Sequence, residues 1–413
     1  ESIPRGENMP YIIGIGSTNF GKHPNHSFQE LAREAITAAL SDAENIHQPQ
    51  NIYFGNCAMH AFGQANIRGQ TALAPLFSDK TLLPNTPITN IENGCATGGT
   101  TFHTALQTLY QNDFSLAVGV EKLIFPNDPK MLKSFPLFAD GIDRHHKEEW
   151  MNFYTTQSQK HDLPFSPHPH RIIFLDVHAM QAHSSIKKGN CTAQDIAYIA
   201  SKNHNNSVEN PRAQYRFPMS TEQVLADRNI IYPFTRSMCA PISDGASALL
   251  LCSDSAFTKL PSSIQSRAVR VLGCAMAGGS MRDHNEHSVT FHAGKKAFAQ
   301  AQCTPEHIDI AELHDSTAHC ELKHMESLGF CTQAGPFVRD GKTKRSGSLP
   351  INASGGLLSK GHPLGATGLG QLFELTTQLR EEAGDIQVSN TPQLALSHNA
   401  GGMIGFDEAV SVV

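Results

Sequence analysis

The chain has 413 residues, of which 39% are hydrophobic and 17% are charged, a composition typical of a globular protein with two domains or one large duplicated fold. Its formal net charge is −6 and it contains no basic stripe, which disfavours a nucleic-acid-binding protein. The sequence lacks an apolar stretch long enough to span a membrane. Its nine cysteines are odd in number and scattered, which disfavours a disulfide framework and predicts a reducing, cytoplasmic location.

The first part of the chain, residues 11–265, has a β-α-β pattern. Residues 1–10 precede it and lack an apolar signal region. Because residues 1–8 stand before Met9, this segment is expected to be a cloning remnant. A helix is predicted from Ser27, which forms a capping-box pattern with Glu30. The other predicted elements are strands at 11–16, 51–56, 87–93, 114–120 and 247–252, and a helix from 95 to 109.

Residues 266–413 repeat this order of elements. The elements predicted there are strands at 269–276, 308–313, 349–354 and 394–397, and helices at 293–303 and 363–379. Two duplicated β-α-β halves predict an α/β fold of layered helices and sheets. The segment at about 125–236 is rich in Pro, His, Lys and Asn, so it is predicted to be a loop insertion with some helices, such as 193–203, that covers an active site.

Cys95 has the placement of a nucleophile. It follows an extended segment and Gly94, and a run of small residues after it opens a helix. A thiol at a helix N-terminus lies at the positive end of the macrodipole, which favours the thiolate. A buried structural cysteine is the competing interpretation, because free cysteines are usually buried.

Three histidines lie at the boundaries of predicted elements. His362 lies in the glycine-rich segment 355–368, which lacks the Gly-Lys-Ser/Thr of a phosphate-binding loop, and it either points into a cleft or belongs to a structural turn. His314 and His398 end strands, a position common in α/β active sites, although structural histidines also occupy such positions. The remaining histidines show no known ligand spacing, so no metal site is predicted.

Together and in this order, these motifs resemble the thiolase superfamily, and most closely its sterol carrier protein 2 thiolase branch. The resemblance extends over nearly the whole chain from Tyr11. It rests on the segments 93–98, 203–211, 243–246, 312–315, 321–322, 355–368 and 398–399. It implies the thiolase fold, with layers in the order α-β-α-β-α and an inserted loop domain.

The resemblance implies a role for each residue of the predicted site. Cys95 would carry the acyl group as a thioester, His362 would activate Cys95, and His314 would hold the oxyanion of the substrate thioester. The glycines expected at the turns around these groups are Gly94, Gly361, Gly401 and Gly402. The N–H of Cys95 and one from the last of these turns would hold the oxyanion of the acyl-enzyme.

Ser316 departs from the pattern of the family. The sterol carrier branch has a cysteine directly after His-Asp that moves the α-proton, and a serine hydroxyl in its place is a poor base. Cys320 would reach the site only if the loop were rearranged. Three interpretations stay open: a thiolase in which Cys320, His398 or a water moves the proton, a decarboxylating condensing enzyme with a Cys-His-His set, and a non-catalytic acyl-CoA-binding relative that works with a partner subunit.

The resemblance also implies ligands and partners. The expected substrates are coenzyme A thioesters, whose nucleotide would meet the insertion and the loop near Ser243 and Gly245. No bound cofactor or metal is implied. A homodimer or a dimer of dimers is expected, and a small zinc-ribbon and OB-fold protein is a further expected partner.

Overall fold

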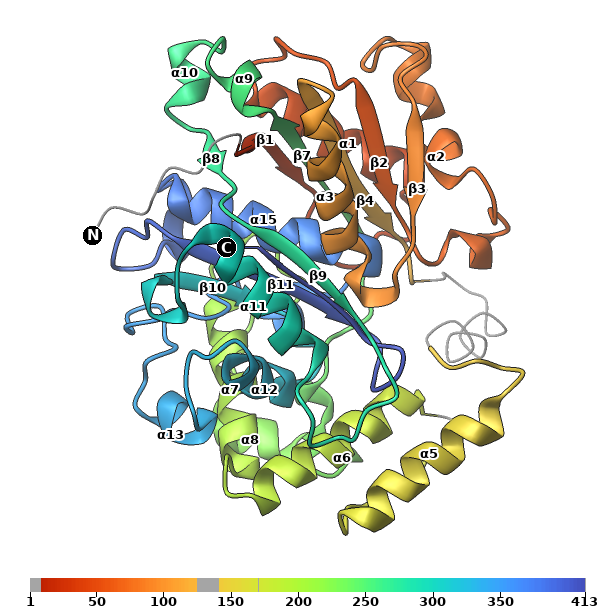
Figure 1. Cartoon of the computed structure of the whole chain (residues 1–413), viewed down its shortest axis with the longest axis vertical. Coiled ribbons are helices and arrows are strands. Elements are labelled where there is room, and N and C mark those ends of the chain that lie inside the picture. The colour runs from red at the N-terminus through yellow and green to blue at the C-terminus, as the bar shows by residue number, and fades with distance from the viewer. Residues whose placement is uncertain (1–8, 125–140, 170, 413) are drawn as a thin grey trace.

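Two mixed β-sheets form the framework of the protein (Figure 1). The computed structural model describes residues 9–124, 141–169 and 171–412. The strands of the first sheet, in spatial order, are β3 (Ile88–Ile91), β2 (Asn51–Gly55), β4 (Phe114–Glu121), β7 (Gly245–Cys252), β1 (Tyr11–Ser17) and β8 (Val269–Arg270). The strands of the second sheet are β10 (Ile310–Leu313), β11 (Ala395–Gly401), β12 (Glu408–Val412) and β9 (Cys274–Gly278).

Helices cover both sheets and fill the space between them (Figure 1). The helices of these layers are α1 (Phe28–Asp42) and α2 (Arg68–Ser78) on the first sheet, α3 (Thr97–Gln107) and α15 (Leu364–Leu379) in the centre, and α11 (Val289–Ala301) on the outer face of the second sheet with α12 (Ala318–Ser327) beside it. Because helices cover both faces of the first sheet, its inner strands are apolar almost throughout, as in the fully buried β7. The predicted α-β-α-β-α layering is confirmed.

The two halves of the chain share one strand order. Ile351 forms a parallel bridge with Ala311 of β10, and so takes the place that β3 has beside β2. The order Ile351 bridge, β10, β11, β12, β9 then corresponds to β3, β2, β4, β7, β1. In both orders the first three members pair in parallel and the remaining pairs are antiparallel. This shared pattern confirms the predicted duplication.

The single strand predicted at 269–276 is wrong, because the chain forms two strands there. Strand β8 pairs with β1 in the first sheet, whereas β9 pairs with β12 in the second. Gly273 lies in the crossing, where a Cβ would be 2.6 Å from the carbonyl oxygen of Ala297. Residues 269–276 are all buried or half-buried, so the hydrophobic pattern does not show where the chain passes from one sheet to the other. The expected boundary between the halves, at 265/266, therefore lies before β8, which still belongs to the first sheet.

The insertion between β4 and β7 is mainly helical. Residues 125–140 of the predicted insertion lie outside the described residues. Its elements are α5 (Lys147–Lys160), α6 (Ile173–Lys187), α7 (Ala193–Ser207), α8 (Thr221–Ala226), β5 (Asn229–Ile231) and β6 (Phe234–Thr235). The helix predicted at 193–203 is confirmed as α7, whereas the β5–β6 pair was not predicted.

Short helices complete the described chain. These are α9 (Asp254–Phe257), α10 (Ser262–Gln265), α13 (Ala334–Arg339) and α14 (Gly356–Lys360). The capping box predicted between Ser27 and Glu30 is confirmed at the start of α1. Within the described ranges, every helix is too short or too polar to cross a membrane.

The central helices α3 and α15 cross at two glycines. A Cβ on Gly98 would lie 2.6 Å from the backbone nitrogen of Gly368, so only glycine permits this approach. The crossing brings the N-terminus of α15 against the short turn Gly94–Ala96 that precedes α3. Cys95 lies in that turn and His362 lies just before α15, so the fold places a residue from each half at the same point.

Candidate active site

A cavity of about 630 Å³ lies where the N-termini of α3 and α15 face the insertion. Both halves of the chain and helix α6 of the insertion contribute to its lining. The residues of the predicted site that line it are Gly94, Cys95, His314, Ser316, His362, Gly401 and Gly402. The cavity therefore brings together most of the residues that the sequence singled out.

Cys95, His314 and His362 form a compact group in this cavity. The Cys95 Sγ and one ring nitrogen of each histidine all lie within 4.8 Å of one another. The two imidazole rings are nearly perpendicular, at 81° and with centroids 5.1 Å apart. One thiol and two imidazoles at this distance allow proton transfer at the sulfur and hydrogen bonding to a carbonyl bound beside it.

The hydrogen bonds of His362 assign its tautomer. Its Nδ1 lies 2.8 Å from the Thr367 hydroxyl, and that hydroxyl donates its own hydrogen to the carbonyl oxygen of Pro363 at 3.0 Å. The Thr367 oxygen must therefore accept, so the proton of His362 is on Nδ1. Its Nε2 is buried and has no hydrogen-bond partner among the described residues. Burial lowers the pKa of His362 to about 3, so Nε2 is a free lone pair at neutral pH.

Asn399 assigns the opposite tautomer to His314. The Asn399 Oδ1 accepts the N–H of Gly99 at 2.9 Å, which orients the amide so that its Nδ2 donates to the carbonyl oxygen of Cys95 at 3.0 Å and faces His314 Nδ1 at 3.1 Å. The His314 Nδ1 is thus an acceptor, and its Nε2 carries the proton. Burial lowers the pKa of His314 well below its usual value, and the nearby ring of His362 lowers it further.

The cysteine of the site is a thiol rather than the expected thiolate. Burial raises the pKa of Cys95 to about 12, although the N–H of Gly402 and the N–H of Cys95 itself act in the other direction. Glu121 and Glu92 add negative charge that raises this pKa further. The positive end of α3 is therefore too weak to ionise the sulfur, and a nearby base has to remove its proton.

The glycine turns lie against the sulfur and the histidine loop. A Cβ on Gly401 would lie 2.9 Å from the backbone nitrogen of Cys95, so this position admits no side chain. Gly94, Gly402 and Gly361 have φ values of +53°, +74° and +116°. The N–H groups of Cys95 and Gly402 both approach the Cys95 sulfur, as the oxyanion hole of an acyl-enzyme would require.

Ser243 and Gly245 lie beneath the His362 loop, and neither is among the described residues that line the cavity. The Ser243 hydroxyl accepts the backbone N–H of His362 at 3.0 Å and donates to Gln214 at 2.6 Å. Both residues are buried in this structure, so the geometry gives no support to the expected contact with the nucleotide, which stays a prediction. Ser243 supports His362 instead.

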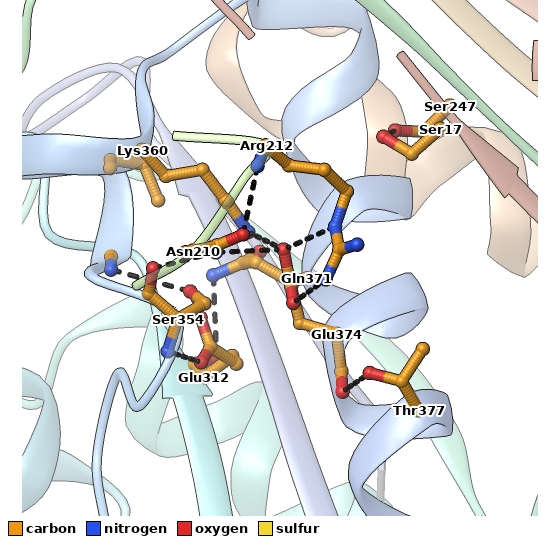
Figure 2. Close-up of polar contacts among 12 residues, drawn as sticks. Ser17, Asn210, Arg212, Ser247, Glu312, Ser354, Lys360, Gln371, Glu374 and Thr377 are labelled. Atoms are coloured by element: carbon orange, nitrogen blue, oxygen red, sulfur yellow. Dashed lines mark hydrogen bonds and ion pairs between the residues drawn. The ribbon is translucent and has the colours of Figure 1, made fainter. Parts of the chain in front are cut away.

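A buried polar network holds the segment before His362 (Figure 2). Lys360, which is 3% exposed, lies 3.7 Å from Glu374 of α15, and Arg212 of the insertion bonds the same carboxylate at 3.0 Å. The Ser354 hydroxyl donates to Glu312 of β10 at 2.7 Å. These contacts fix the segment between the central helix, the second sheet and the insertion, which restricts the position of the imidazole.

Cys320 faces the cavity without any rearrangement, contrary to the expectation from the sequence. It lies in the first turn of α12, and its Sγ is 3.8 Å from the Ser316 hydroxyl. The same Sγ lies 3.6 Å from Nδ1 of His178, on helix α6. The side chains of Ser316, Cys320 and His178 all line the cavity.

His398 lies behind the site and is not among the described residues that line the cavity. Its side chain is fully buried, and its Nε2 lies 3.0 Å from the Thr290 hydroxyl. Its ring packs on His324 at 4.3 Å, and burial lowers its pKa to about 3. His398 thus lies in β11 behind the cavity wall, packed against His324, which does line the cavity.

Three cavity or support residues were not assigned from the sequence. Asn399 and Thr367 hold the two catalytic candidates His314 and His362, and His178 lies beside Cys320. Asn399 and Thr367 occur within the quoted motifs, so their positions were visible but their hydrogen-bond partners were not. His178 had no local signal, because α6 meets α12 only in the fold.

Comparisons with known proteins found relatives along nearly the whole chain. A family described as "Thiolase C-terminal domain-like" matches residues 276–413. The acetyl-CoA acetyltransferase of Methanothermobacter thermautotrophicus is 32% identical over 95% of this chain and 96% of its own length, and human sterol carrier protein 2 is 32% identical over 95% of this chain and 69% of its own. A solved structure entitled "Ltp2-ChsH2(DUF35) aldolase" has a TM-score of 0.74 at 19% identity, and covers 98% of this chain and 97% of that one.

Proposed function

Because the chain belongs to the thiolase family of acyl-CoA acyltransferases, we propose that it moves acyl groups between coenzyme A thioesters through a thioester on Cys95. The observation that carries this proposal is the pair of opposite tautomers around the Cys95 thiol. The free Nε2 lone pair of His362 is suited to accept the thiol proton, and the Nε2–H of His314 is suited to donate to a carbonyl.

In thiolysis, His362 Nε2 takes the proton of Cys95 while Sγ bonds to the 3-oxo carbon of the substrate. The oxygen of that carbon becomes negative and accepts from the N–H groups of Cys95 and Gly402. The bond between the α- and β-carbons then breaks, which leaves the acyl group on Sγ and an enolate whose oxygen accepts from His314 Nε2–H. The enolate takes one proton and leaves as an acyl-CoA. Coenzyme A then attacks the thioester and leaves as a second acyl-CoA. Its thiol proton replaces the one given to the enolate, and the proton held by His362 returns to Cys95.

A decarboxylating condensation is the second candidate. It is favoured by a Cys-His-His group beside Ser316, because loss of CO₂ from a malonyl thioester creates the carbanion without a base. A third candidate is acyl-CoA binding with a partner subunit, and the neighbour whose title names a DUF35 component supports a search for such a partner. The expected homodimer is part of the proposal and is measured by light scattering.

The test measures thiolysis of 3-oxoacyl-CoA substrates of increasing chain length together with the mass of the Cys95 peptide after a rapid quench. We expect turnover and an acyl adduct on Cys95 in the natural chain, and neither in Cys95→Ser. Cys331→Ser is the matched control, since Cys331 is half-buried outside the cavity. An unmodified Cys95 with every 3-oxoacyl and malonyl thioester would exclude both catalytic candidates and leave acyl-CoA binding.

A further inference from the structure

The proposed carbon–carbon chemistry requires a group that moves a proton at the α-carbon. Ser316 follows His314 and Asp315 directly, but a hydroxyl of ordinary pKa is a poor base. His362 and His314 are already engaged at the thiol and at a carbonyl. A further acid or base on the cavity wall therefore has to be found among the residues that the acyl transfer itself does not use.

Cys320 is the residue on the cavity wall that best meets this need. Its Sγ lies 3.6 Å from His178 Nδ1, 3.2 Å from the Thr317 hydroxyl and 3.8 Å from the Ser316 hydroxyl. Cys320 is 5% exposed and His178 is 9% exposed, and both line the same cavity as Cys95. The Cys320 sulfur thus contacts the hydroxyl of Ser316, the residue at the position where the sterol carrier branch has its cysteine.

The charges around Cys320 favour its ionised form. Burial opposes ionisation, but the charge and hydrogen bond of His178, the Thr317 hydroxyl and the charge of Lys323 outweigh it and lower the pKa of Cys320 to about 6. Lys323 lies one helical turn further along α12 and donates to Gln181 of α6 at 3.0 Å. Cys239 also faces this sulfur, and burial raises its own pKa to about 12. Cys320 thus differs in charge state from this neighbouring thiol.

The other groups near the cavity are less suited. Burial raises the pKa of Cys57 well above its usual value, and its Sγ contacts Gly94 and Thr97 at 3.1 and 3.0 Å. Burial lowers the pKa of His324 well below its usual value, and its Nδ1 lies 3.2 Å from the Thr290 hydroxyl.

We propose that Cys320, paired with His178, is the acid and base for the α-carbon. This proposal rests on the proposed function. In thiolysis Cys320 reacts in its thiol form: it gives its proton to the enolate carbon as the C–C bond breaks, and becomes the thiolate that its contact with His178 stabilises. In condensation the Cys320 thiolate takes an α-proton from a second acetyl-CoA. The resulting carbanion attacks the acetyl thioester on Cys95, and the Cys95 sulfur departs and takes a proton back from His362.

Exchange of α-hydrogens separates this step from acyl transfer. The enzyme is incubated with acetyl-CoA in heavy water, and both deuterium in the acetyl group and the mass of the Cys95 peptide are measured. We expect Cys320→Ser to form the acetyl adduct on Cys95 but to lose exchange by about 100-fold or more, whereas Cys331→Ser retains both. Exchange at the natural rate in Cys320→Ser would overturn the assignment. No adduct in the natural chain would instead overturn the proposed function, and the Cys320 assignment with it.

A second measurement does not depend on turnover. The rate of alkylation of Cys320 by iodoacetamide, followed by peptide mass, is expected to level off above about pH 7, because the pKa of this thiol is about 6. In His178→Asn the midpoint should rise by about one pH unit or more, and the pH profile of α-hydrogen exchange should shift in the same direction. An unchanged midpoint in His178→Asn would show that this imidazole does not set the charge of Cys320, and would overturn the pairing.

Discussion

Replacing Thr367 by valine tests the tautomer assigned to His362. The substitution keeps the shape of a buried side chain, which is 2% exposed, and removes the oxygen that accepts His362 Nδ1–H at 2.8 Å. Two outcomes are open to the imidazole. Either Nδ1–H stays without an acceptor, or the proton moves to Nε2 and the lone pair facing Cys95 is lost.

Either outcome has a cost that can be estimated. A buried donor left without its acceptor costs about 1–3 kcal/mol. If the ring keeps its tautomer, it lacks the acceptor that stabilises Nδ1–H when the ring becomes cationic on taking the Cys95 proton. If it changes tautomer instead, the productive form is disfavoured by the same amount. Because 1.4 kcal/mol is about a factor of ten in rate, acylation of Cys95 should slow by roughly 5- to 150-fold in Thr367→Val.

The assay is the burst of coenzyme A released on rapid mixing with an acyl-CoA, which reports acylation alone. Thr377→Val is the matched control, since Thr377 is a buried threonine of the same helix whose hydroxyl donates to the carbonyl oxygen of Glu374 at 2.7 Å. Both variants should lose similar thermal stability, but only Thr367→Val should lose acylation rate. Equal bursts in the two variants would refute the tautomer argument.

Two further outcomes are expected. Gly401→Ala should slow acylation by about 100-fold, because its Cβ would lie 2.7 Å from the Ala96 nitrogen and displace the donors around the sulfur. Gly21→Ala is the control, since there is open space at its Cβ. Equal acylation rates in the two variants would contradict this prediction. Alkylation of Cys95 should rise about tenfold per pH unit between pH 7 and 10 without levelling off, because burial raises its pKa to about 12, whereas a plateau near neutral pH would indicate a resting thiolate.

The sequence was sufficient for the fold and for the three residues at its centre. Cys95, His314 and His362 each lie at the end of a predicted element, but local sequence left a structural role open for each of them, and it was the resemblance to the family that implied their meeting. The charge state of Cys95 was predicted wrongly, because the helix N-terminus is visible in sequence but the burial that outweighs it is not.

Cys320 shows a second limit of predicting a site from the sequence alone. Cys320 was expected to reach the site only after a rearrangement, because the segment was interpreted as a loop. Helix α12 begins at Ala318, so the chain turns there and Cys320 comes back to within 3.8 Å of the Ser316 hydroxyl. Partners from other elements, such as His178 for Cys320 and Asn399 for His314, depend on packing between segments more than 80 residues apart, as their separations of 142 and 85 residues show.

The division of the site between the two halves makes acylation a measure of complete folding. Cys95 belongs to the first half, whereas His362, His314 and Asn399 belong to the second, and they meet only because α3 and α15 cross closely at Gly98 and Gly368. A molecule in which one half has folded and the other has not carries an ordinary sulfhydryl without its base. The fraction of chains that take up one acyl group therefore counts the molecules whose halves have docked, so active-site titration during refolding follows the last assembly step directly.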